Sequence, residues 1–62
     1  MTRILCYDIK YPAGVEGPTE VEVTVNLPTN WMFEFVPARE AVKKVLEAKI
    51  GLKVFRFDWR PL

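Results

Sequence analysis

The stretch TEVEVTVNL, residues 19–27, alternates apolar and polar side chains more regularly than any other part of the chain. Successive side chains of a β-strand point to opposite faces, so the apolar residues of this stretch share one face. That face consists of Val21, Val23, Val25 and Leu27. The pattern predicts a half-buried antiparallel strand with a solvated outer face.

Another strand is predicted over residues 2–11, and the Pro- and Gly-rich loop 12–18 joins it to residues 19–27. The two strands are expected to pair as an antiparallel hairpin, with the more apolar face of residues 2–11 toward the core. This face consists of Leu5, Tyr7, Ile9 and Tyr11, and the opposite face consists of Ile4, Cys6, Asp8 and Lys10.

A helix is predicted from Pro37 to Ile50. Proline suits the first helical position, and Gly51 suits the left-handed conformation that ends many helices. Lys49 lies in the last turn, where its charge complements the helix dipole. The apolar face at helical spacing consists of Ala38, Ala41, Val42, Val45, Leu46 and Ile50.

The last strand is predicted over residues 52–60. Its alternation places Phe55, Phe57 and Trp59 on one face, and Val54, Arg56, Asp58 and Arg60 on the other. Aromatic side chains on an exposed sheet face can stack single-stranded bases. Here the opposite face is the polar one, so the three aromatic residues are predicted to belong to the core.

These elements predict one small α+β domain over residues 1–62, with the order ββ(β)αβ and one helix on one face of a mostly antiparallel sheet. The strand at residues 2–11 is expected to be central, in a sheet of three or four strands. The uncertain strand is WMFEFV, residues 31–36, which is either a short strand, slightly favoured, or an apolar loop. If residues 31–36 form a strand, the strand at residues 52–60 runs parallel to the strand at residues 2–11. If they do not, these two strands are antiparallel.

The chain offers few side chains for catalysis, since it has no His, Ser or Gln and Cys6 is the only thiol. A nucleophilic Cys needs a base or an electropositive setting, so Cys6 is expected to be a half-buried strand residue. Asp8 and Asp58 are expected to form cross-strand charge pairs with Lys and Arg rather than an acid–base pair. We therefore predict no enzyme activity, no cofactor and no metal site.

The net charge of +1 lacks the basic excess that is typical of dedicated nucleic-acid binders. No apolar run approaches the roughly 18 residues of a membrane span, and the N-terminal residues lack the apolar core of a signal peptide. A lone thiol fits a reducing compartment. A cytoplasmic protein with no membrane partner and no small-molecule substrate is expected.

The segment 31–36 carries five bulky apolar residues in six, which are hard to bury in so small a domain. Contiguous exposed apolar patches mark interfaces, whereas the competing prediction places this segment in the core. We expect a small non-catalytic protein–protein interaction module, an accessory subunit or small inhibitor of the kind that phages and mobile elements encode. The predicted contact residues are Trp31, Met32, Phe33 and Phe35, with Arg39 and Lys43 at the rim.

The sequence leaves open whether the partner is a second copy of the chain or a foreign protein. The alternative function is a small nucleic-acid-binding module that uses the helix and the last strand. Its phosphate-binding residues would be Lys43, Lys44, Lys53, Arg56 and Arg60.

Overall fold

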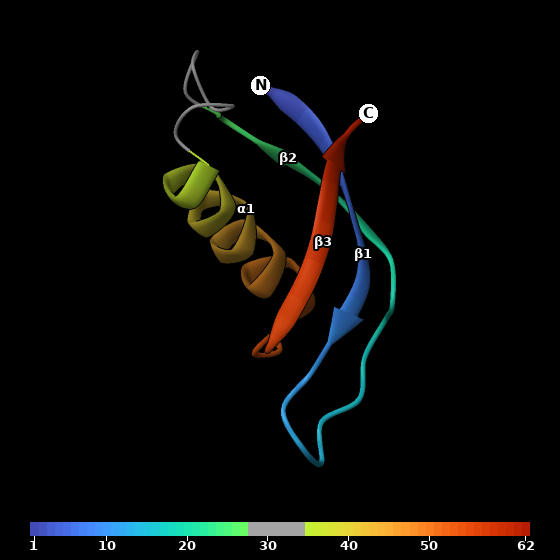
Figure 1. Cartoon of the computed structure of the whole chain (residues 1–62). Coiled ribbons are helices and arrows are strands. Elements are labelled where there is room, and N and C mark those ends of the chain that lie inside the picture. Colours follow the sequence, from blue (N-terminus) through green and yellow to red (C-terminus); the bar gives the residue numbers. More distant parts are fainter. Residues whose placement is uncertain (28–34) are drawn as a thin grey trace.

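The computed structural model describes residues 1–27 and 35–62, without the side chain of Phe35. Its elements are β1 (Thr2–Lys10), β2 (Val21–Val25), α1 (Phe35–Ile50) and β3 (Arg56–Pro61). The three strands form one antiparallel sheet in the order β2-β1-β3, and α1 lies across one face of it (Figure 1). The predicted α+β class, the hairpin and the central position of the first strand are confirmed.

The connection from β2 through α1 to β3 passes over β1, so β2 and β3 flank it and both run antiparallel to it. Phe35 and Val36 belong to α1, and the prediction of a strand at these two residues is wrong. Pro37 lies within the first turn, where backbone N–H groups have no hydrogen-bond acceptor inside the helix, so the lack of an N–H costs no hydrogen bond. Residues 28–34, which hold the rest of that predicted strand, lie outside the described residues.

The central strand β1 changes face at a β-bulge. Tyr7 pairs with Asp58 and Lys10 pairs with Arg56. Between these two pairs β1 has two residues and β3 has one, which is the extra residue of a β-bulge. Asp8 lies in this bulge with a φ of 49°, a left-handed conformation that Asp tolerates better than most residues.

The bulge overturns half of the prediction for β1. Ile4 and Cys6 are buried, whereas Leu5 and Tyr7 are only half-buried on the outer face, so the predicted orientation is wrong before the bulge. Beyond it, Ile9 is buried as predicted. The inserted residue restores the predicted orientation because each residue inverts the side-chain direction.

A second break in alternation precedes β3. The backbone bends at Phe55, so that Val54 and Phe57 are both buried while Phe55 keeps 68% of its surface exposed. The predicted core position of Phe55 is wrong, as is the predicted outer position of Val54. Phe57 is in the core and Trp59 packs partly buried against it, as predicted.

The core lies between α1 and the sheet. The predicted apolar face of α1 is confirmed, since Ala38, Val42 and Leu46 are fully buried and its other members pack partly buried against the core. The core cluster consists of Ile4, Cys6, Ile9, Val23, Val25, Val42, Leu46, Val54 and Phe57. No helix in the described parts of the chain is long and apolar enough to cross a bilayer.

The end of α1 is fixed by three hydrogen bonds. Gly51 takes the predicted left-handed conformation, with a φ of 70°, and its N–H donates to the carbonyl of Glu47 at 2.9 Å. The carboxylate of Glu47 accepts from the N–H of Val54 at 2.7 Å. Lys49 donates to the carbonyl of Glu22 on β2 at 2.5 Å, which ties the last turn of the helix to the sheet.

The loop between β1 and β2 packs against the chain that follows α1. The hydroxyl of Tyr11 donates to the carbonyl of Pro18 at 2.5 Å. A Cβ on Gly17 would lie 2.7 Å from the ring and hydroxyl of Tyr11 and 2.8 Å from Cδ1 of Leu52. Gly17 is therefore a point of close approach that holds the loop against Leu52.

We predict that Gly17→Ala lowers the free energy of unfolding by about 1–3 kcal/mol, because Tyr11 or Leu52 must move to admit the methyl group. Chemical denaturation of the two proteins measures this difference. Glu16→Ala, in the same loop but exposed, is the control and should stay within about 0.5 kcal/mol of wild type. Equal stability of Gly17→Ala and wild type would show that the loop does not pack as described.

Candidate interaction surfaces

The predicted contact residues fall mainly outside the described chain. Trp31, Met32 and Phe33 lie in residues 28–34, and Phe35 is the first residue of α1. Val36, the last residue of the same apolar run, is 68% exposed in the first turn of the helix. At its described end, the run therefore reaches the protein surface.

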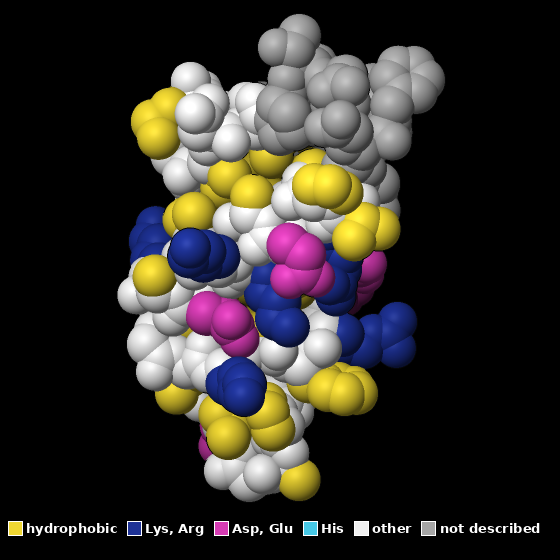
Figure 2. Space-filling model, turned by 90° about the vertical axis from the view of Figure 1, so that its left-hand side faces the viewer, with side chains coloured by type: hydrophobic (Ala, Val, Ile, Leu, Met, Phe, Trp, Pro, Cys, Tyr) yellow, Lys and Arg dark blue, Asp and Glu magenta, His cyan; other side chains and the backbone are white. Residues whose placement is uncertain are grey.

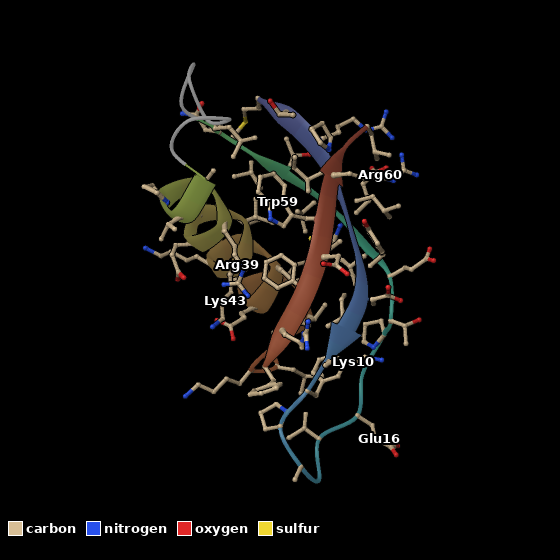
Figure 3. All side chains as sticks on the ribbon, viewed as in Figure 1. Lys10, Glu16, Arg39, Lys43, Trp59 and Arg60 are labelled. Atoms are coloured by element: carbon tan, nitrogen blue, oxygen red, sulfur yellow. The ribbon has the colours of Figure 1, made fainter. Side chains whose placement is uncertain are left out.

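Arg39, one of the two predicted rim charges, has partners within the chain. Its guanidinium lies 5.1 Å from the ring centre of Phe57, in cation–π geometry, and 3.7 Å from the carboxylate of Glu40. A stacked Arg of this kind contributes about 0.5–1 kcal/mol and covers a core ring from solvent. Lys43 lies one turn further along α1 and is half-buried (Figure 3).

The outer face of the sheet has Leu5 and Tyr7 on β1 between polar residues of the edge strands. Arg3 donates to the carboxylate of Glu22 at 2.8 Å, and this hydrogen bond lowers the pKa of Glu22. Arg3 on β1 and Glu22 on β2 thus form a cross-strand charge pair, which was not predicted.

A shallow hollow of about 340 Å³ lies at the β-bulge. It is lined by Asp8, Lys10, Arg56, Phe57 and Asp58. Within residues 1–27 and 35–62, its four charged side chains form no salt bridge, so the pairing predicted for Asp8 and Asp58 is absent there. The hollow is open and mixed in charge, which differs from the enclosed setting that perturbs a catalytic carboxylate.

The five cations of the alternative nucleic-acid function do not share one surface. Lys43 and Lys44 are on α1, whereas Arg60 is on the opposite side of the sheet, since its neighbour Trp59 packs on the core (Figure 3). The helix side shows Lys and Arg mixed with Asp and Glu across its middle, and hydrophobic side chains toward both ends (Figure 2). In the chain, Lys43 and Lys44 are adjacent on α1, whereas Lys53, Arg56 and Arg60 lie before and along β3.

Sequence reasoning missed Phe55 as a surface residue. Lys53 and Arg56 flank it in the chain, and its N–H donates to the carbonyl of Lys10 at 2.8 Å. The alternation of residues 52–60 gave no sign of the bend that turns Phe55 outward. One hint was present, because Val54 is apolar on the face that was assigned to solvent.

Cys6 is fully buried, more than predicted, and burial raises the pKa of its thiol from 9.0 to about 11. Desolvation opposes the thiolate because a charge is costly away from water. The thiol therefore stays protonated at neutral pH, and Cys6 serves as a small apolar core residue.

Comparison with protein-family models, with curated proteins and with solved structures finds no match to this chain.

We predict a loss of stability at alkaline pH that depends on Cys6. The folded thiol has the higher pKa, so its contribution is complete below about pH 9 and is lost as the pH rises toward about 11. The expected loss is about 2–3 kcal/mol in the free energy of unfolding. Denaturant titrations across this range measure it.

Cys6→Ala is the control for that measurement, since it removes the thiol and keeps every other ionisable group. The variant should start less stable and should lose less stability as the pH rises. Parallel curves for wild type and variant would contradict the burial of the thiol.

Proposed function

We propose that this chain is a small non-catalytic protein-binding domain of the cytoplasm. Its contact surface would be the apolar run 31–36, with Trp31, Met32, Phe33 and Phe35 as the contact residues. It would act as an accessory subunit or a small inhibitor, by occupying the surface of a partner. A phage or mobile-element origin is part of the same proposal and rests on size and composition alone.

The exposure of Val36 carries this proposal. A branched apolar side chain with 68% of its surface exposed, directly after five residues that include four large apolar ones, is typical of the margin of an interface.

The surroundings of Val36 suit a protein partner. Arg39 and Lys43 follow it at helical spacing, and both are half-buried. Interface margins are polar around an apolar centre, and Arg is enriched in interfaces. The partner is a second copy of the chain or a foreign protein, and the mass in solution distinguishes the two.

We predict that Trp31→Ala changes the free energy of unfolding by less than about 0.5 kcal/mol, because a contact residue is exposed in the free domain. Trp59→Ala is the matched control. Trp59 packs against the core, and removing it should cost about 3–5 kcal/mol. Chemical denaturation measures both variants. A loss for Trp31→Ala as large as that for Trp59→Ala would place the segment in the core and end the proposal.

Light scattering coupled to size-exclusion chromatography, over a range of protein concentrations, identifies the partner class. If the partner is a second copy, the wild type forms a dimer and Trp31→Ala is a monomer. A monomeric wild type with a stable Trp31→Ala variant assigns the surface to a foreign protein. A dimer that Trp31→Ala leaves intact would contradict the proposed contact surface.

A further inference from the structure

Phe55 is presented to solvent on a fixed backbone. Val54 before it and Phe57 after it are both buried in the core, and the N–H of Phe55 donates to the carbonyl of Lys10. A phenyl ring that keeps 68% of its surface in water is therefore held outward by its neighbours. An aromatic side chain in such a position loses little conformational entropy when it is covered, which favours its use as a binding anchor.

Three cations accompany this ring. Lys53 and Arg56 flank it in the chain, and Lys10 is the cross-strand partner of Arg56. All three side chains are exposed, and within the described residues none of them forms a salt bridge. Asp8 and Asp58 share a hollow with Lys10 and Arg56, but in the described part of the chain neither carboxylate forms a salt bridge with them.

Three other cations of the chain have partners within it. Arg3 pairs with Glu22, Arg39 lies on Phe57 beside Glu40, and Lys49 donates to a carbonyl of β2. The cations near Phe55 form no salt bridge with the described residues, so an anionic group on a partner can pair with them.

The hollow beside Arg56 indicates which anionic partner fits. Asp8 and Asp58 line it together with Lys10 and Arg56, so the two signs of charge alternate there. A nucleic-acid strand brings a negative charge at every nucleotide and would meet both carboxylates. A polypeptide can place its own carboxylates on the cations and its N–H groups on Asp8 and Asp58, and it carries apolar side chains to cover Phe55.

We propose that Phe55, with Lys10, Lys53 and Arg56, forms a docking site for an acidic protein segment that places an apolar side chain on the phenyl ring. The site is at the start of β3, which lies apart from the start of α1, where Val36 is (Figure 1). It deepens the proposed protein-binding function by adding a second surface and the chemistry of its partner. Because the two surfaces are separate, the failure of one leaves the other standing.

The test uses the ¹⁵N-labelled full chain and three probes. The first is a short capped peptide in which a phenylalanine is flanked by aspartates and glutamates. The second has lysines in place of the acidic residues, and the third is a thymidine oligonucleotide. Amide shifts are followed during titration at low salt. We expect saturable shifts with the acidic peptide, centred on Lys10 and on residues 53–57, and no comparable shifts with the other two probes.

Two variants test the named residues. Phe55→Ala should weaken binding of the acidic peptide about tenfold, and Lys53→Glu with Arg56→Glu should weaken it at least about fivefold. Lys44→Glu is the control, because it reverses a charge on an exposed part of α1 away from the proposed site. It should change the affinity less than about twofold, because salt screens charges at that distance. The amide spectra of all variants report whether each one is folded.

Three results would overturn the proposal. Equal binding of the acidic and lysine peptides would show that charge does not select the partner. Tighter binding of the oligonucleotide at the same amides, weakening steeply with salt, would assign the surface to nucleic acid. An absence of shifts at Lys10 and residues 53–57, at peptide concentrations well above the protein, would show that no acidic segment docks there, whatever the Trp31 variant shows.

Discussion

The β-bulge at Asp8 determines which side chains of the central strand face the helix. Before it, Ile4 and Cys6 point into the core, and after it Ile9 does, although an uninterrupted strand would point Ile9 outward. Burying an Ile side chain stabilises a fold by roughly 1.5–3 kcal/mol, which exceeds the cost of about 1–2 kcal/mol for a non-Gly residue in the left-handed conformation. The same bulge opens the hollow that Lys10 and Asp8 line.

Both open edges of the sheet are protected. The N–H of Leu62 donates to the carbonyl of Arg3, so the backbone groups of Arg3 face β3. The backbone groups of its neighbours on β1, Thr2 and Ile4, therefore face β2. By strand alternation, the carbonyl of Glu22 then faces the open edge of β2, and Lys49 donates to it there. On β3, the nitrogen of Pro61 faces the open edge and has no hydrogen to offer. A helix lysine and a proline thus limit strand addition at both edges.

This edge protection bears on how the protein binds partners. Pairing through a sheet edge needs a row of unused backbone groups, and here part of each row is already bound or missing. Side chains exposed on the surface are then the better route to a partner. Val36 and Phe55 are such side chains, and they lie in the first turn of α1 and directly before β3.

Much of the fold was predictable, because two segments carry unambiguous patterns. The alternation of residues 21–27 and the helical face that includes Val42 and Leu46 have one apolar side each, and only one arrangement buries it. The outward turn of Leu5 and Tyr7 was not predictable, since both faces of β1 are apolar and the bulge that chooses between them has no signature in a single Asp. The bend at Phe55 was not predictable either, because the alternation of aromatic residues continues through it to Phe57 and Trp59.

The candidate sites were harder to predict than the fold, for a physical reason that these two errors share. Burial is decided by the whole domain, and local alternation records it only where the backbone is regular. Function gathers where regularity breaks, because a bulge or bend turns outward a side chain that a regular strand would bury. Phe55 is such a case: the pattern that assigned it to the core was correct for Phe57 and Trp59, and the one irregular position became the exposed one. In a small domain, every large apolar side chain left outside lowers an already modest stability. The exposure of Phe55, beside cations that form no salt bridge with the described residues, is therefore better explained by a binding surface than by a defect of packing.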